Sequence, residues 1–600
     1  RDPLAAVAGG VSGRRLLLLL DNCEHVLEAA AALCETAIEA GAAVRILATS
    51  REALSVPGEV VRRLRPLSVP DDGEGPDGLA QSPAVRLFVD RARAAGAPET
   101  DLADVAQIAQ VCRELDGIPL AIELAAARVP FLGVRGLLDR LDDRFRVLTS
   151  GRRTRVPHHQ TLRAAIDWSD RLLDETERLL FARLSVFSAS FDLEAAEAVC
   201  GWGGIAADDV LDVLGRLVDR SLVTVMASGG QVRYRLLDTI RRYARERLEE
   251  VGETRPMRRR HAEYHRELAR QGALALRGSA QLQWRDRLTA VTDDLRAALA
   301  WAGSNGDGEL LLELAAGLWD FWVRFGHLLE GHRWVTVALE ACPDGPVDLR
   351  ATALAQAALS SWWLGDLEGA DRRAGESLVL RGEETGAVSA AFALQVAGIV
   401  AAWRGDPDGA GDRFARSADL FRAAGDSWGV ASALNRMEEL ARKGGDVERA
   451  AELAAESLAL YEELGDPWGT GWSRWALGRA AATLGRGEEA DEHFRAGLRL
   501  SAEIGHLTGI AFSLLGLAET SAHTGDWERA VRLHGAADGL ATFIGAPLGA
   551  PVWHGASSFD PDAARQQLGE PAFEAAWQEG RGLSAEAAVA LALGASRSVG

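Results

Sequence analysis

The sequence predicts a multidomain protein: a partial α/β domain, then a helical segment, a winged helix and an all-α solenoid of helical repeats. Three patterns support this fold class. Two apolar runs with polar ends flank a helix-like stretch near the start, amphipathic helices and a hairpin follow up to about residue 251, and a glycine turn then recurs every 40 residues. In addition, 600 residues are too many for one hydrophobic core.

The composition limits the classes of function. The formal charge of −21 and the pI near 5.2 argue against a surface that coats nucleic acid. The cysteines are scattered and none stand at CxxC spacing, which suits a reducing compartment and argues against a zinc site. The longest leucine run, 16–20, is too short to cross a bilayer. We therefore expect a cytoplasmic protein with no membrane contact.

The first apolar run ends in a carboxylate. Leu16–Leu20 is followed by Asp21, a helix-like stretch covers about 26–40, and a second run, 44–48, is followed by Thr49-Ser50-Arg51. Continuous apolar runs are typical of parallel strands buried on both faces, and their carboxyl ends meet at one edge of a sheet. An aspartate there can hold Mg²⁺ through water, and the Thr/Ser-Arg group can sense a γ-phosphate. Alternatively, Asp21 or Asn22 caps the next helix and Arg51 pairs with Glu52 or Glu59.

The stretches LLLLLDNCEH, ILATSREAL, VPGE and RLRPLSVP resemble the Walker B to sensor segment of NB-ARC-like STAND P-loop ATPases, and more narrowly those of AfsR/SARP-type and LuxR-type actinobacterial regulators. LDGIPLAIELAA, residues 115–126, is similar to the GLPLA segment of that family. The resemblance implies ATP or ADP with Mg²⁺ as cofactor and nucleotide contacts from Gly117, Pro119 and Leu120. The alternative for these three residues is a plain turn with proline at a helix start.

Two departures argue against an intact ATPase. The chain contains no GxxxxGK[ST], so no loop cradles the β- and γ-phosphates. Because it also starts with Arg1 in what resembles the middle of a domain, we treat it as N-terminally truncated. Asn22 stands where many ATPases have a second carboxylate; Glu24 is a candidate base, or simply stabilises a helix N-terminus. We expect the complete protein to be at most a slow regulatory ATPase and this chain alone to be inactive.

Residues 161–251 show winged-helix organisation. Helices are predicted over 161–173, 175–187, 193–200 and 208–220, and a hairpin over 222–236 with its turn at 227–230. In the resembled family this domain clamps ADP and normally does not contact DNA, so we expect DNA contact only through a domain outside this chain. Leu236-Leu237-Asp238 matches the Met-His-Asp clamp motif, with the histidine lost and Asp238 kept as a nucleotide contact.

Two histidines, His261 and His265, stand at i and i+4 as in zinc-binding helices. The glutamate between them is not in the HExxH position, and the sequence offers no evident third ligand. A solvated helical face is the interpretation we adopt for this segment.

The 40-residue period is the most objective signal in the sequence. A glycine turn followed by alanine recurs from Gly365 to Gly525, and a second glycine turn falls halfway through each unit. A column of small residues, Ser377, Ser417, Ser457, Gly497 and Ala537, keeps the same register. Each unit is therefore predicted to be a pair of helices in a TPR-like solenoid, whose concave face binds a protein or a small-molecule effector. The many tryptophans are predicted to fill the core between repeats rather than to line a groove.

The predicted domain boundaries are 1–70 for the truncated NTPase domain, 80–150 for the helical domain, 155–254 for the winged helix, 255–349 for a helical adaptor, 350–548 for the repeats and 549–600 for a helical cap. The predicted function is an ADP/ATP-dependent switch in a transcriptional regulator, with repeats that sense a signal and with nucleotide-dependent self-association. Two alternatives remain: a nucleotide-independent interaction scaffold, and the regulatory block of a fused nucleotide cyclase.

Overall fold

Two parallel strands follow the first helix of the chain. In the computed structural model, α1 (Pro3–Val11) precedes β1 (Leu16–Leu20), α2 (Leu27–Ala40) and β2 (Val44–Ala48), and β1 pairs with β2 from Leu16↔Val44 to Leu20↔Ala48. The predicted strand–helix–strand order is confirmed. The expectation of strands buried on both faces is wrong for these residues. Leu17, Leu19 and Leu47 are 61%, 65% and 59% exposed, because α2 packs against one face only.

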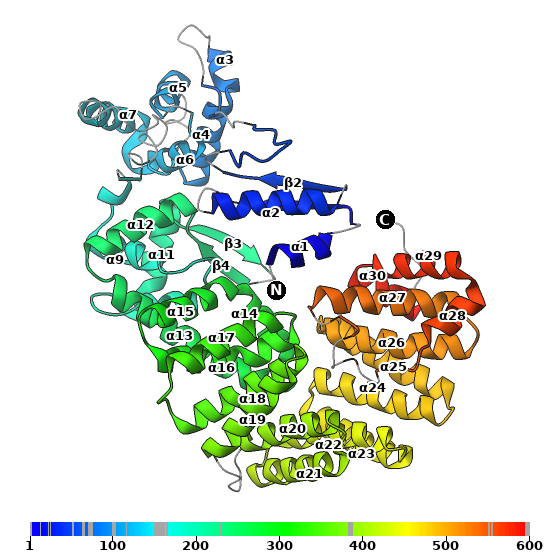
Figure 1. The fold of residues 1–600 in the computed structure, drawn as a ribbon. Helices are drawn as coiled ribbons and strands as arrows, with labels where there is room; N and C mark the ends of the chain where they lie inside the picture. The colour runs from blue at the N-terminus through cyan, green and yellow to red at the C-terminus, as the bar shows by residue number, and fades with distance from the viewer. Residues whose placement is uncertain are drawn as a thin grey trace. The chain divides into compact units, whose positions relative to one another are not determined.

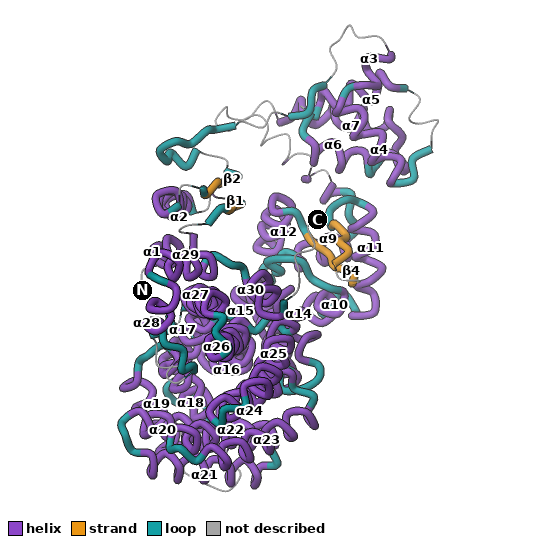
Figure 2. Tube along the Cα trace, turned by 90° about the vertical axis from the view of Figure 1, so that its right-hand side faces the viewer, coloured by secondary structure: helices purple, strands orange, loops and turns teal. Residues whose placement is uncertain are grey.

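The structure describes residues 3–11, 14–21, 23, 26–41, 43–50, 53–62, 66–69, 76–98, 104–115, 117–148, 163, 166–167, 169–228, 231–381, 388–545, 547–549, 553 and 556–594. These fall into two compact units. One contains 62–265 and 290–301, and the other contains 1–61, 266–289 and 302–600. Strands occur at two places in the described part of the chain, and helices make up most of the rest (Figure 2).

The helical segment is a cluster of short helices. They are α3 (Pro76–Gln81), α4 (Pro83–Ala94), α5 (Val105–Glu114), α6 (Pro119–Ala126) and α7 (Val129–Leu148), the last broken at Gly133. The winged helix that follows consists of α9 (Glu175–Leu184), α10 (Leu193–Cys200), a short 3-10 turn at 207–209, α11 (Val210–Asp219), β3 (Thr224–Ser228), β4 (Gln231–Arg235) and α12 (Asp238–Glu250). One buried apolar cluster runs from Leu79 to Met257, so both segments share a core.

Three details refine the predicted winged helix. Ser228 pairs with Gln231, so Ala227 and Ser228 belong to the strand and the turn is shorter than predicted. Phe191 forms an additional antiparallel bridge to Tyr234, which widens the β-ribbon. The predicted helix over 161–173 falls largely outside the described residues.

The adaptor is helical, as predicted. Its helices are α13 (Thr254–Ala275), α14 (Gln281–Ala290), α15 (Thr292–Ser304), α16 (Gly308–Arg324) and α17 (Leu328–Ala341). The last two form a hairpin that packs against the first repeat, so helical pairing begins one hairpin earlier than the 40-residue period indicates.

Five helical hairpins form the repeats and stack in chain order (Figure 1). The first helices of the hairpins are α18 (Val347–Trp363), α20 (Val388–Trp403), α22 (Ser427–Lys443), α24 (Pro467–Thr483) and α26 (Leu507–His523). The second helices are α19 (Leu367–Arg381), α21 (Pro407–Ala424), α23 (Val447–Leu464), α25 (Gly487–Glu503) and α27 (Trp527–Phe543). Three short helices follow in the segment predicted as a helical cap: α28 (Pro561–Leu568), α29 (Glu570–Arg581) and α30 (Ala585–Leu593).

The recurring glycines end one helix and the next residue begins another. At every 40-residue position from Gly365 to Gly525 the glycine φ is positive, which residues with a Cβ rarely adopt. The aspartate that follows usually caps the next helix. Asp406 and Asp446, for example, accept hydrogen bonds from the backbone N–H of Gly409 and Arg449. The recurring pair of residues thus has two roles: the glycine ends one helix, and the residue after it usually caps the next.

The column of small residues lets the two helices of a hairpin approach closely. Its serines also form hydrogen bonds. Ser377, Ser417 and Ser457 each donate to a backbone carbonyl oxygen 26 residues earlier, at 2.8, 2.7 and 3.0 Å. At Gly497 a Cβ would lie 3.1 Å from the carbonyl oxygen of Gly471, closer than most side chains tolerate.

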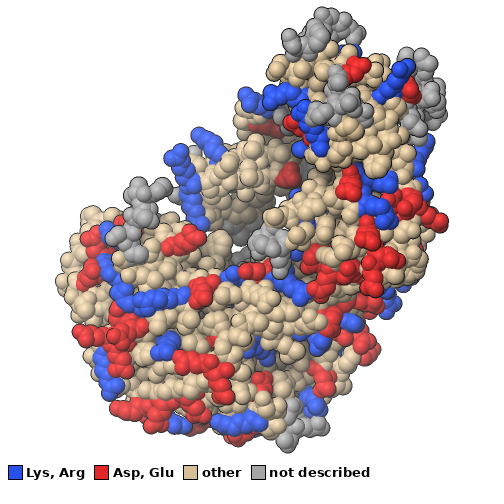
Figure 3. Space-filling model, turned by 180° about the vertical axis from the view of Figure 1, so that it is seen from behind, with Lys and Arg blue, Asp and Glu red and all other residues tan. Residues whose placement is uncertain are grey.

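The described surface and helices show two further features. Basic and acidic side chains are interspersed over the face seen in Figure 3. Among the described helices, none is long and apolar enough to cross a membrane.

His506 replaces the capping aspartate at one turn, and this gives a pH-dependent prediction. Burial lowers its pKa from 6.5 to about 3, so below pH 6.5 the unfolded chain binds a proton that the folded chain does not. Stability from this group is complete above pH 6.5 and is lost as the pH falls. At pH 5 the loss is about 2 kcal/mol, at 1.36 kcal/mol per unit. We predict that His506→Asn, which can still cap α26, reduces the drop in urea-unfolding free energy between pH 7.5 and pH 5.

His523→Asn, at the other end of α26, serves as the control. An equal pH-dependent drop in wild type and His506→Asn would contradict the prediction.

Candidate functional site

The structure brings Asp21 and Thr49 together at the carboxyl ends of β1 and β2. Thr49 N donates to Leu20 O at 2.8 Å, and Cys23 N donates to Thr49 O at 2.9 Å, which fixes the two strand ends side by side. The Thr49 hydroxyl donates to Asp21 Oδ1, and both side chains are exposed. Ser50 is also exposed, whereas Asn22, Glu24 and Arg51 lie outside the described residues.

This arrangement suits part of a Mg²⁺–nucleotide site. A carboxylate beside a hydroxyl offers the hard oxygen ligands that Mg²⁺ prefers. A phosphate cradle also needs a lysine, and the single lysine of the sequence, Lys443, lies in α22 and pairs with Glu439 at 2.7 Å. The residues of this chain therefore fit the Mg²⁺ part of such a site, and the lysine of a phosphate cradle is not among them.

Gly117 has a clear structural role. Its φ is +64°, it accepts a hydrogen bond from Leu67 N at 2.9 Å, and a Cβ at this position would lie 2.2 Å from Leu67 O. Pro119 is the first residue of α6 and Leu120 is half-buried behind it. These three residues belong to a different unit from Asp21 and Thr49. The turn and helix start are as expected; the nucleotide role of Gly117, Pro119 and Leu120 stays a prediction.

Asp238 is the first residue of α12, and nothing further is described of its side chain. Its neighbours differ from each other: Leu236 is 2% exposed and Leu237 is 38% exposed. A nucleotide contact from Asp238 remains a prediction.

We predict that Gly117→Ala strongly destabilises the unit that contains it. The variant forces both a strained φ and a clash with the backbone of Leu67, and strain of this kind costs about 1–3 kcal/mol before the clash is counted. Gly96→Ala is the matched control, because Gly96 has a φ of +86° but nothing within 4 Å of the position that a Cβ would take. Urea unfolding should show a clearly larger loss for Gly117→Ala. Equal losses would mean that the chain near Leu67 moves aside at little cost.

The outward face of α11 is acidic. In a winged helix this position corresponds to the helix that enters the major groove. Here Asp208, Asp209, Asp212 and Asp219 are exposed in or beside α11, and Arg216 is paired with the buried Glu177 at 3.0 Å. This surface would repel a phosphate backbone.

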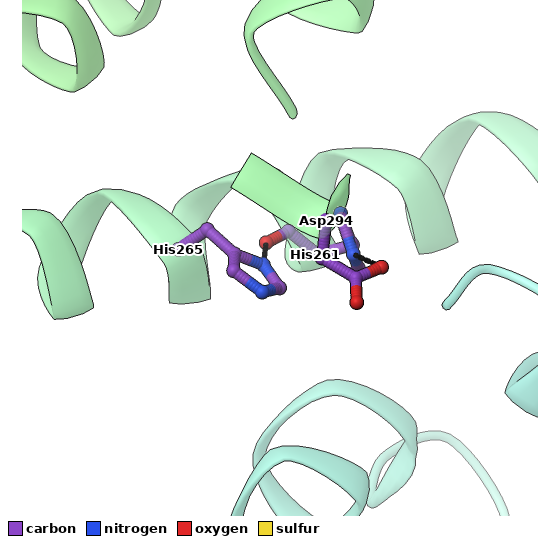
Figure 4. A group of neighbouring side chains, drawn as sticks. All are labelled: His261, His265 and Asp294. Carbon is purple, nitrogen blue, oxygen red and sulfur yellow. Dashed lines mark hydrogen bonds and ion pairs between the residues drawn. The ribbon is translucent and has the colours of Figure 1, made fainter. Parts of the chain in front are cut away.

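The histidine segment does not form a solvated face; that interpretation is wrong. His261 and His265 are 2% and 1% exposed, and both lie beside Asp294, which is 1% exposed (Figure 4). His261 Nε2 donates to Asp294 Oδ1 at 3.1 Å, and Ser188 N donates to the same oxygen at 2.6 Å. The third residue was missed because Asp294 is in another helix, α15, where no spacing rule points to α13.

The electrostatics of this group follow from burial. Burial lowers the pKa of His265 to about 3, so the ring is neutral at ordinary pH. Burial alone would raise the pKa of Asp294. The hydrogen bonds from His261 and Ser188 lower the pKa by more than burial raises it, so the pKa lies below its usual range. A buried carboxylate therefore stays charged in an apolar surrounding.

A cavity of about 660 Å³ lies among the helices of the adaptor and the first two repeats. Its walls come from α13, α16, α18 and α20, which all contribute residues of one unit. The walls are mainly apolar, with charged groups from α13 and α16. The lining residues include Leu274, Ala316, Trp319, Leu349, Gln356, Leu359, Phe392, Gln395, Val396, Arg266, Arg270, Arg277, Glu313 and Asp320.

Three buried polar atoms in this wall have no hydrogen-bond partner: Trp319 Nε1, Gln356 Oε1 and Gln395 Nε2. Neighbouring bonds orient both amides. Gln356 Nε2 donates to Ala316 O at 3.1 Å, and Gln395 Oε1 accepts from Ser432 Oγ at 3.2 Å. The residues of the wall thus contain two donors and one acceptor that are buried and that the protein does not satisfy, which is unusual for buried groups.

The tryptophans of the repeats are largely core residues, as expected. Trp362 and Trp428 are 5% and 7% exposed, and Trp428 stacks on Trp468 with ring centroids 6.0 Å apart. Trp319, in α16 of the adaptor, differs from these core tryptophans because it is buried and also lines the cavity.

Asp466 joins the adaptor to the repeats. The side chain is fully buried and its oxygens accept from Gln281 Nε2 at 3.1 Å and Trp428 Nε1 at 2.6 Å, besides capping α24. Arg324, 2% exposed, lies 3.8 Å from the carboxylate and over the ring of Trp468. The carboxylate therefore stabilises contacts among α14, α16, α22 and α24.

We predict that Asp466→Ala costs about 3–5 kcal/mol, the range expected when a buried charge loses its partner. Asp446→Ala is the matched control, because Asp446 caps α23 by the same bond but is exposed, and should cost about 1 kcal/mol. Urea unfolding followed by tryptophan fluorescence measures both. Similar losses in the two variants would show that Asp466 acts only as a cap.

One part of the chain matches a known family of domains. Residues 173–249 match the family described as "Winged helix-turn-helix domain", in agreement with the observed fold.

Individual relatives come from mycobacteria. The chain is 41% identical over 370 residues to a protein provisionally named as the HTH-type transcriptional regulator Rv0890c of Mycobacterium tuberculosis, covering 61% of this chain and 40% of that protein. It is also 41% identical over 253 residues to the protein Rv0894 of the same organism, covering 41% of this chain and 61% of that protein. The chain thus spans about 40% of the length of the first of these relatives.

Among solved structures, the chain is similar to PH0952 from Pyrococcus horikoshii, a Signal Transduction ATPase with Numerous Domains (STAND) protein with a tetratricopeptide repeat sensor. The match has a TM-score of 0.47 and 14% identity, and it covers 96% of this chain and 84% of that one. A second similar structure, Cut9–Hcn1 of the APC/C, has a TM-score of 0.29 and 14% identity over 76% of this chain and 89% of that one.

Proposed function

We propose that this chain is the sensing and switching part of a transcriptional regulator, in which the repeats bind an effector and a nucleotide site records the signal. The observation that carries the proposal is the cavity among α13, α16, α18 and α20, with its unsatisfied donors and acceptor. A volume of about 660 Å³ lies within the range of small-molecule sites, which run to about 1,000 Å³. The mycobacterial relative supports the regulatory role.

The chemistry of the wall indicates the kind of effector. Most of the lining is apolar, and Arg277 is already paired with Asp320 at 2.9 Å. A ligand therefore gains most from apolar contact, and a rotation of the Trp319, Gln356 or Gln395 side chain would let it match their unsatisfied groups. This favours a neutral, mainly apolar small molecule that carries both a hydrogen-bond acceptor and a donor.

The nucleotide part of the proposal depends on Asp21 and Thr49. Their contact at the ends of two parallel strands supports a Mg²⁺-binding role, and the phosphate cradle would be supplied by sequence outside this chain. ADP or ATP would then be the stored signal, and self-association would depend on it. DNA contact belongs to a different domain in this proposal, because the exposed face of α11 is acidic.

The effector role predicts a selective loss of binding in Trp319→Phe. This change removes an N–H that has no partner in the protein, so stability should change little, whereas affinity for a compound that accepts from Trp319 should fall about tenfold, the equivalent of one hydrogen bond of about 1.4 kcal/mol. Compounds found by a thermal-shift screen provide the ligands, and calorimetry provides the affinities. Trp403→Phe is the control, since Trp403 is 38% exposed and does not line the cavity.

Compounds whose affinity is unchanged by Trp319→Phe would place the effector elsewhere. The nucleotide role is tested separately with labelled ADP and ATP, on this chain and on a version extended at its N-terminus. Binding by the extended version alone is expected. Binding by neither would favour the nucleotide-independent scaffold.

A further inference from the structure

His261, His265 and Asp294 form a group with the composition of a metal site. One ligand atom from each residue lies within 4.8 Å of the other two, and all three side chains are buried. The histidines stand one turn apart on α13, and Asp294 comes from the first turn of α15. All belong to one unit.

The hydrogen bonds of His265 select which ring nitrogen is free. Its Nδ1 lies 2.7 Å from the backbone oxygen of His261, which can only accept, so Nδ1 carries the proton and Nε2 keeps its lone pair. Metal-binding histidines typically hold their second nitrogen in this way, by donating to a backbone carbonyl. In Figure 4 the Nδ1 side of the ring faces that oxygen, and the opposite nitrogen is turned away from it.

Asp294 is left with an unsatisfied oxygen. Oδ1 accepts from Ser188 and His261, whereas Oδ2 is buried without any hydrogen-bond partner. The free nitrogen of His265 is likewise an acceptor, so the group contains more acceptors than donors. A buried negative charge beside unused lone pairs is costly unless a cation offsets it.

We propose that His261, His265 and Asp294 bind a divalent transition-metal ion, with Zn²⁺ as the expected occupant. Two imidazoles and a carboxylate are suitable ligands for Zn²⁺, and the site is closed and uses no redox chemistry. The ion takes the place of the proton that Nε2 of the neutral His261 ring now donates to Asp294, and that proton moves to Nδ1 of the same ring. Small side-chain rotations bring the three ligand atoms from within 4.8 Å to coordination distance. The site uses none of the five cysteines, whose spacing led us to expect no zinc site.

The ion would connect two parts of this unit. Asp294 accepts from Ser188, which follows α9 of the winged helix, while His261 and His265 belong to α13. A metal held by all three would fasten α13 to α15, and the hydrogen bond from Ser188 to Asp294 joins α15 to the segment that follows α9.

The test is the metal content and metal response of the purified chain. We expect about one equivalent of zinc by mass spectrometry, a lower melting temperature after chelation and its recovery on adding Zn²⁺. Asp294→Asn keeps an acceptor for Ser188, and His265→Gln keeps a donor for His261 O. Both should bind Zn²⁺ at least about 100-fold more weakly, whereas His332→Gln, at a histidine outside the group, should match wild type.

Zinc content that is unchanged in both variants would overturn the proposal. So would a wild-type chain that contains no metal and shows no change in melting temperature with Zn²⁺, Co²⁺ or Ni²⁺. In that case the group is a His261–Asp294 hydrogen bond without a metal. If the variants do not fold, chelation and re-addition on the wild-type chain decide the question alone.

Discussion

The buried carboxylate of Asp466 is the constraint on which the sensing part of the molecule depends. It occupies a turn that recurs every 40 residues, and here the aspartate itself accepts a hydrogen bond from an adaptor side chain, Gln281. Arg324 lies beside the Asp466 carboxylate. Arg277 lies 4.5 Å from the centre of the Trp428 ring, whose N–H donates to Asp466, and Arg277 also pairs with Asp320 in the cavity wall. One buried charge is thus coupled through two arginines to the wall of the proposed effector site.

This coupling gives a physical route from ligand to helix arrangement. A molecule that fills the cavity touches α13 and α16 from the adaptor as well as α18 and α20 from the repeats. Its binding energy can therefore favour one packing of adaptor on repeats over another, which is what a sensor requires. A ligand bound to a single helix would have no such effect, because it could not distinguish two arrangements of several helices.

The parts of the fold that could be predicted from sequence are those determined by local rules. Gly365 and its periodic equivalents mark the repeats because a positive φ favours glycine wherever it occurs. The aspartate that usually follows caps the next helix by accepting from the backbone N–H three residues later. The contact between Asp21 and Thr49 follows from parallel strand order alone. Each of these features depends on a few neighbouring residues.

What could not be predicted depends on distant packing. His261 and His265 have the spacing of a helical surface pair, and they are buried by residues from elsewhere in the chain, such as Asp294 and Phe187. One face of β1 is exposed although its sequence is apolar. A strand is buried only where another element covers it, and the sequence of the strand does not show whether such an element is present. The cavity likewise results from four helices that fail to fill the space between them, and Trp319 is as apolar in sequence as the tryptophans of the core.

The uniform turn has a consequence for the history of the protein. Most hairpins end and begin with the same pair of signals, so a duplication or deletion of one 40-residue unit generally leaves the helices on either side with compatible ends. Most units can therefore be gained or lost without disturbing the register of the array. The unit that carries Asp466 cannot, since the adaptor recognises it individually, and the array should vary in length on either side of this hairpin while keeping the hairpin itself.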